Sequence, residues 1–161
     1  MRLTPLLLLL NIAGCAAVLR HGPPREDVAS VEGSLCGPSF RLDERLLSPA
    51  IIQSVEPSYG AIYTKSGRQQ SLIGAQLRML ALPDLTPQWI NRTLRCHAAR
   101  QILGREPPVP NDPYWLPGAP VEIRVVAEEV SFLVLLHTDG IDNVRMLLER
   151  ARAYSQRSPS P

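Results

Sequence analysis

The strongest constraint on the fold is the order of short apolar segments and one well-capped helix between residues 51 and 154. Thr86 and Pro87 are residue types preferred at a helix N-cap and at the first helical position. Gly104 is the type preferred just beyond a helix end. These signals predict a helix over residues 87–103.

Strand-like segments lie on both sides of this helix. Residues 51–55, 59–65 and 72–82 precede it, and residues 121–127 and 130–137 follow it. The segment 121–127 alternates apolar and charged side chains, which is typical of a half-buried strand. The segment 130–137 is almost wholly apolar, which favours a central strand.

The last element is predicted to be a helix over residues 140–154, capped by Asp139. Its apolar residues recur at helical spacing and comprise Ile141, Val144, Leu147, Leu148, Ala151 and Tyr154. The sequence therefore predicts an α+β domain over residues 49–155. We expect a two-layer sandwich in which an antiparallel sheet carries two helices on one face, in the order ββαββα.

The first fifteen residues indicate export. Arg2 precedes an apolar run, and small residues precede Cys15, as in a secretory signal. The stretch Ile12-Ala13-Gly14-Cys15 resembles a bacterial lipobox, where a diacylglyceryl group is attached to the cysteine and the chain is cut before it. The resemblance implies a signal peptide over residues 1–14 and lipidation at Cys15.

Two alternatives compete with this interpretation. An ordinary signal peptide would be cut near Ala16 or Ala17, and an uncleaved anchor would need an apolar span of about 20 residues. The residue after Cys15 is Ala16 and not Asp. By resemblance to Gram-negative lipoproteins, this favours the outer membrane over the inner membrane. We therefore expect a lipid anchor in the outer membrane with the domain in the periplasm, and a Gram-positive surface is the other option.

Residues 15–48 are predicted to form a flexible tether. They contain Gly22-Pro23-Pro24 and a charged cluster, and their hydrophobic periodicity is poor. Residues 156–161 are predicted to be a disordered tail.

Composition and motifs exclude several functions. The formal net charge is +2, Lys65 is the only lysine, and no basic stripe with interleaved aromatics is present. Nucleic-acid binding is therefore not expected. No P-loop, dinucleotide-binding motif or nucleophile elbow occurs, so we predict a non-enzymatic protein without a cofactor.

Cys36 and Cys96 are a candidate disulfide, because two thiols remain if Cys15 is lipidated in an oxidising compartment. Closing that loop would contribute about 4 kcal/mol. The alternative is two unpaired thiols. Cys96 and His97 are weak metal-ligand candidates, because adjacent helical residues point about 100° apart and distant ligands such as His137 would be needed.

The remaining candidates each have a structural alternative. His97 is expected on the core face with one hydrogen bond. His137 beside Asp139 is either a base or simply a strand end before a helix cap. Tyr114 and Trp115 form a candidate binding loop. The alternative, that they cover the core, is the one we favour.

Residues 74–103, in which Leu85-Thr86-Pro87-Gln88-Trp89 leads into Arg95-Cys96-His97-Ala98-Ala99-Arg100, resemble a segment of uncharacterised lipoproteins from GC-rich Gram-negative bacteria. The loop 112–118 and the final strand-strand-helix resemble the same group. That group has no assigned activity, so the resemblance implies only export and lipidation at Cys15. We expect a lipid-anchored binding or assembly module whose partners are the membrane and another envelope protein. The alternative is a periplasmic metal- or redox-handling protein that uses Cys96 and His97.

Overall fold

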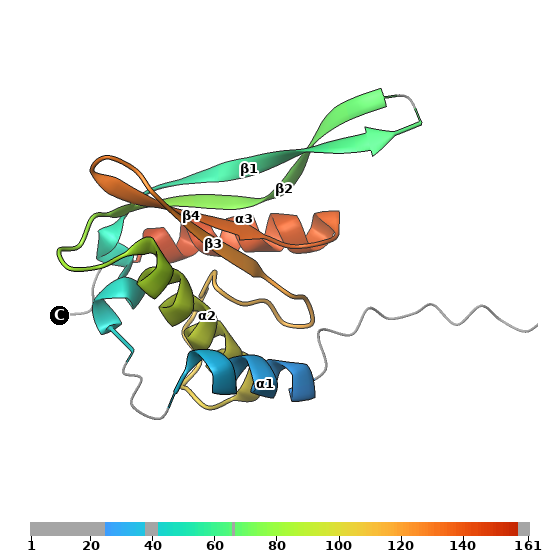
Figure 1. The fold of residues 1–161 in the computed structure, drawn as a ribbon. Helices are drawn as coiled ribbons and strands as arrows, with labels where there is room; N and C mark the ends of the chain where they lie inside the picture. The colour runs from blue at the N-terminus through green and yellow to red at the C-terminus, as the bar shows by residue number, and fades with distance from the viewer. Residues whose placement is uncertain (1–24, 38–41, 66, 158–161) are drawn as a thin grey trace, which may run out of the picture.

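The computed structural model describes residues 25–37, 42–65 and 67–157. Over these residues the fold is α+β, with a four-stranded antiparallel sheet and three α-helices (Figure 1). In chain order the elements are α1 (Arg25–Leu35), the short 3₁₀ helices η1 (Glu44–Leu47) and η2 (Pro49–Ile51), β1 (Ile52–Thr64), β2 (Gly67–Leu80), α2 (Pro87–Leu103), β3 (Glu122–Ala127), β4 (Ser131–His137) and α3 (Ile141–Ser155).

Helix α2 has the bounds and caps that the sequence predicts. The Thr86 side chain accepts a hydrogen bond from the Trp89 amide, and Gly104 ends the helix with a φ of 68°. The predicted cap of α3 is wrong. Gly140 holds the N-cap position without a side-chain bond, while Asp139 contributes only its backbone carbonyl, which accepts from Asn143.

The strand order is β1-β2-β4-β3, so β4 is an inner strand as its apolar sequence predicts. The two segments predicted as separate strands at 51–55 and 59–65 are one long strand, β1. Its register with β2 shifts between Ser58 and Tyr59. Such irregularities increase the local twist of a strand pair. Beyond this point the β1–β2 hairpin leaves the sheet (Figure 1).

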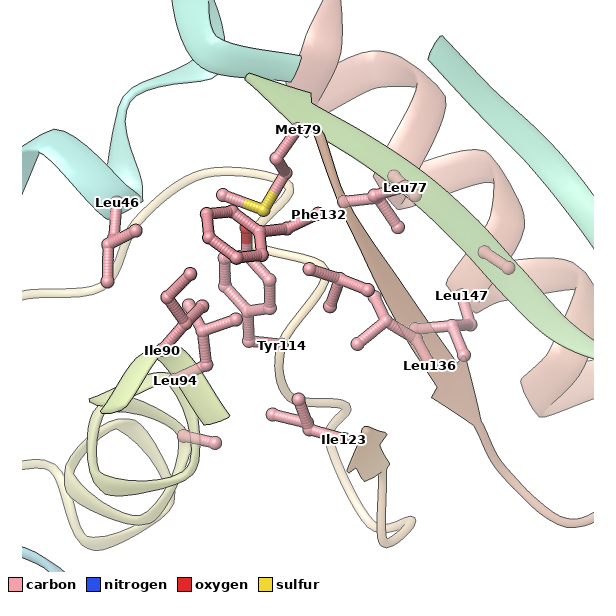
Figure 2. Close-up of a cluster of buried hydrophobic side chains, with 14 of the residues drawn as sticks. Leu46, Leu77, Met79, Ile90, Leu94, Tyr114, Ile123, Phe132, Leu136 and Leu147 are labelled. Carbon is pink, nitrogen blue, oxygen red and sulfur yellow. The ribbon is translucent and has the colours of Figure 1, made fainter. Parts of the chain in front are cut away.

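The core lies between one face of the sheet and the helices α2 and α3 (Figure 2). Alternate residues of β2 and β4 point into it, in cross-strand pairs such as Leu77 with Val134. Helix α2 contributes Ile90 and Leu94, and α3 contributes Leu147. The apolar faces of α2 and α3 pack against the same face of the sheet. Burial of these two faces stabilises a two-layer arrangement.

Helix α1 is the main departure from expectation, because residues 15–48 were predicted to be a flexible tether. Val28 is buried, the carbonyl of Leu35 accepts a hydrogen bond from Arg92, and farther along the predicted tether Leu46 joins the core. The folded part therefore already includes residues 25–35 and Leu46, before the predicted domain start at residue 49. Residues 15–24, including Cys15, lie outside the described residues.

The position of α1 also accounts for burial on a second side of α2. Ala99 of α2 is buried. Helix α1 packs against α2 on the side away from the sheet (Figure 1). Within the described ranges, no helix has the length and apolar character needed to span a membrane.

Candidate functional site

A disulfide joins Cys36, just after α1, to Cys96 in α2. Both residues are buried, and 60 positions separate them along the chain. The Cys96 sulfur is therefore bonded and is not a free metal ligand. Across residues 25–37, 42–65 and 67–157, no three or more His, Cys, Asp and Glu side chains are grouped to hold a metal ion.

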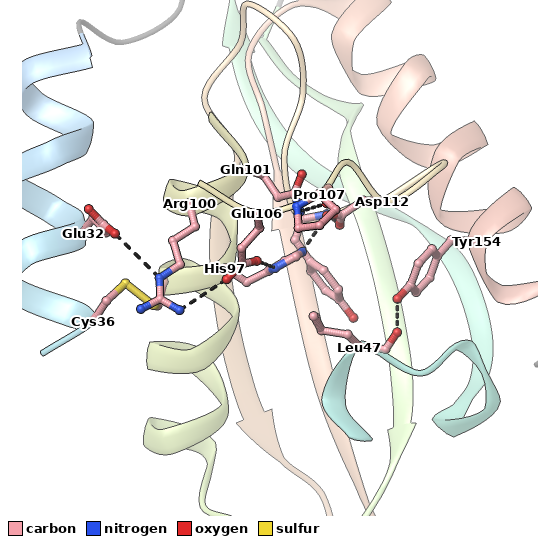
Figure 3. A network of polar contacts seen from close by, with 12 residues as sticks. Glu32, Cys36, Leu47, His97, Arg100, Gln101, Glu106, Pro107, Asp112 and Tyr154 are labelled. Carbon is pink, nitrogen blue, oxygen red and sulfur yellow. Dashed lines mark hydrogen bonds and ion pairs between the residues drawn. A yellow bond between two sulfur atoms is a disulfide. The ribbon is translucent and has the colours of Figure 1, made fainter. Parts of the chain in front are cut away.

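His97 lies beside the disulfide and bridges two carboxylates (Figure 3). Its Nδ1 is 2.7 Å from Glu106 Oε2, and its Nε2 is 2.7 Å from Asp112 Oδ2. The imidazole is 1% exposed. The expectation of a single hydrogen bond is therefore wrong, since both ring nitrogens are engaged.

The charged network continues from this imidazole in two directions. On one side, Glu106 accepts from Arg100, and Glu32 of α1 pairs with both Arg100 and Arg105. On the other side, the carbonyl of Asp112 accepts two hydrogen bonds from Arg150 of α3, at 3.0 and 2.8 Å. A chain of ionic and polar contacts therefore connects α1, α2, the loop before β3, and α3.

Two opposing effects act on the pKa of His97. Burial disfavours the charged imidazolium and lowers the pKa, but the hydrogen bonds and negative charges of Asp112 and Glu106 outweigh it. The pKa is therefore raised above its ordinary value. An enclosed imidazole with both nitrogens occupied is suited to holding the loop against α2, and it offers no lone pair to a substrate.

Tyr114 is fully buried, so the prediction that it is an exposed residue of a binding loop is wrong. Its ring meets those of His97 and Tyr154 edge to face, with centroids 6.3 Å apart in both pairs. Burial raises the pKa of the phenol, which stays neutral. Trp115 is half-buried beneath the guanidinium of Arg150, 5.4 Å from the ring centroid. The loop mainly covers the core, as the favoured alternative predicts.

His137 lies on the face of the sheet that points away from α2 and α3. It contacts Ser58 of β1 across β2, the strand between them. Its Nε2 is 3.0 Å from Ser58 Oγ. Gly74 of β2 pairs with both residues and makes this contact sterically feasible. A Cβ at position 74 would lie 1.8 Å from the carbonyl oxygen of Leu136 and 2.9 Å from the His137 ring.

The surroundings of His137 include a hollow of about 210 Å³, to which Glu122 and Asp139 also contribute. A serine hydrogen-bonded to histidine is the pair used in nucleophilic catalysis. However, Ser58 is only 3% exposed and does not line this hollow. The geometry therefore favours a structural cross-strand bond between Ser58 and His137 over a nucleophile open to substrate.

A second hollow, of about 180 Å³, lies between α1, α2 and the start of β3. Its lining is mostly apolar, with Arg95 and Asp27 also contributing, and its apolar residues include Val28, Val31, Ala98, Ile102, Val121 and Ile123. Apolar concavities with a few polar groups are the usual form of binding sites. We call this feature the α1 hollow and take it as the candidate binding site.

Sequence reasoning missed the α1 hollow because it did not predict α1. The available signal was the pair Val28 and Val31, three residues apart and followed by Cys36. In comparisons with known proteins, no family model, curated sequence or solved structure matches this chain.

Proposed function

We propose that this chain is an exported, lipid-anchored envelope protein whose domain is a non-enzymatic binding module for another envelope protein. The Cys36–Cys96 disulfide is the observation that carries the proposal. Disulfides persist in oxidising compartments such as the bacterial periplasm. The disulfide therefore favours a location outside the cytoplasm. The lipobox-like residues 12–15 independently indicate export to such a compartment.

The α1 hollow supports the binding role. The disulfide, the Arg92 bond to Leu35 and the ion pairs of Glu32 all hold α1 in place, so the hollow is preformed. Val31 beside it is 38% exposed, an apolar side chain left in contact with water. Burial of an apolar side chain from a partner protein would remove this surface from water.

The described histidines favour binding over catalysis. His97 is enclosed between two carboxylates, and His137 is bonded to a serine that water scarcely reaches. The metal-handling alternative is weakened because Cys96 is oxidised and both His97 nitrogens are engaged.

Intact-mass analysis of the mature protein tests the anchor. We expect a chain that begins at Cys15 and carries a diacylglyceryl group, and we expect the Cys15→Ser variant to keep its leader. Envelope fractionation should place the wild type with membranes. A bare Cys15 thiol, or an uncut leader in the wild type, would refute the anchor.

A charge placed at the α1 hollow tests the binding role. The Val31→Glu variant should reduce capture of a partner from the envelope by about tenfold or more, because the partner would have to desolvate a carboxylate. Val130→Glu is the matched control, since Val130 is 79% exposed on the β3–β4 turn. Equal capture by both variants would remove the α1 hollow as the binding site.

A further inference from the structure

The β1–β2 hairpin extends beyond the sheet as a two-stranded ribbon. Strand β4 pairs with β2 from Gly74 to Leu80, whereas β1 and β2 remain paired as far as Thr64 and Gly67. We call residues 59–72 the hairpin arm. Its six paired positions on β1 give it a length of about 20 Å. An isolated two-stranded ribbon is only marginally stable in water.

The charged side chains of the hairpin arm are all positive. Lys65 and Arg68 are exposed near its tip, and no Asp or Glu occurs in residues 59–72. Tyr59 at its base is 59% exposed. Two cations beside an exposed tyrosine suit the interface of an anionic bilayer, where the surface potential attracts basic residues and tyrosine is enriched.

The position of the arm relative to the predicted anchor strengthens this match. In Figure 1 the arm extends to the upper right and the start of α1 lies at the lower right, so both lie on the same side of the molecule, whereas α3 ends on the left. Nine residues separate Cys15 from Arg25. Even fully extended, this link spans about 35 Å at most. A lipid at Cys15 would therefore keep this side of the domain near the bilayer.

We infer that the hairpin arm contacts anionic lipid headgroups through Lys65 and Arg68 and orients the domain on the membrane. The inference rests on the lipid anchor proposed above. Two basic residues give weak attraction by themselves, but an anchor makes the contact intramolecular and raises its effective concentration. The arm would then be the second membrane attachment of the same chain.

Lys65 provides a direct test because it is the only lysine. The lipidated protein is reconstituted into vesicles of phosphatidylcholine alone or of phosphatidylcholine with phosphatidylglycerol. Acetylation of Lys65 Nζ by a water-soluble ester is then followed by peptide mass spectrometry. We expect labelling to be about fivefold slower on the anionic vesicles, and high salt should restore it.

An Arg152→Lys variant supplies a matched amine on the last turn of α3, on the opposite side of the molecule in Figure 1. Its labelling should not depend on lipid charge. Equal Lys65 rates on both vesicles, or equal slowing at both amines, would overturn the inference. Protection of Lys65 in native envelopes but not in vesicles would assign the arm to a protein partner and would also overturn it.

Failure of the anchor is detected separately by the intact mass. If Cys15 proves unmodified, the full chain is added to the same vesicles at excess lipid. Slower Lys65 labelling on the anionic vesicles alone would still support the arm contact, and equal labelling would refute it.

Discussion

Reduction of the Cys36–Cys96 disulfide is expected to lower the free energy of unfolding by about 4 kcal/mol. The bond closes a loop of 60 residues that contains β1 and β2, so breaking it restores conformational freedom to a long segment of the unfolded chain. Urea titrations of the oxidised and reduced protein measure the difference. The double variant Cys36→Ala, Cys96→Ala should show a similar loss without reductant.

Helix α1 should respond most strongly to reduction. It has 11 residues, and isolated helices shorter than about 12–15 residues are marginal in water. Hydrogen exchange of the α1 amides should therefore accelerate before the sheet amides do. The double variant is the control for the reductant, which should leave it unchanged. Equal urea midpoints for the oxidised and reduced wild type would contradict the prediction.

The difference between α1 and α2 shows what local sequence can predict. Helix α2 was predicted from Pro87 to about Leu103 because Thr86, Pro87 and Gly104 act on the backbone immediately around them. Strand β4 was predicted because its apolar run suits an inner strand. Helix α1 contains Gly33 and is held by Cys96 and Arg92, roughly 60 positions away. Contacts with residues so far away in the chain leave no pattern in the local sequence from which the helix could be predicted.

The contacts of the two histidines escaped prediction for a similar reason. Ser58 and His137 are 79 positions apart, and they meet only because β1 and β4 pair with β2 on either side of Gly74. One-residue slips of either strand would separate them. The loop that brings Asp112 to His97 has no regular structure, so its path could not be read from periodicity.

Replacing Asp112 with alanine is the second change with a large expected effect, a loss of about 3–5 kcal/mol. The variant would leave His97 Nε2 without its carboxylate and the Tyr114 amide without its acceptor, both in buried positions. An unpaired buried donor or charge costs far more than an exposed one. Glu149→Ala on the exposed side of α3 removes the same charge and should change stability by less than about 0.5 kcal/mol.

The pH dependence of unfolding separates the ionic role of Asp112 from simple packing. The pKa of His97 is raised in the folded protein above its ordinary 6.5, because two carboxylates stabilise the imidazolium. This stabilisation is fully present below about pH 6.5 and is lost as the pH rises through the folded pKa. The neutral ring has one N–H and can serve only one of the two carboxylates.

Urea titrations across that pH range should therefore show wild-type stability falling as the pH rises. The fall should be much smaller in Asp112→Ala, and the part due to residue 97 should be absent in His97→Gln, because a glutamine side chain does not titrate. Asp112→Asn keeps an oxygen for the Tyr114 amide and should recover part of the stability, but not the pH dependence. A wild-type profile that matches that of His97→Gln would show that His97 is neutral in the fold and that the carboxylate at 112 acts only as a hydrogen-bond acceptor.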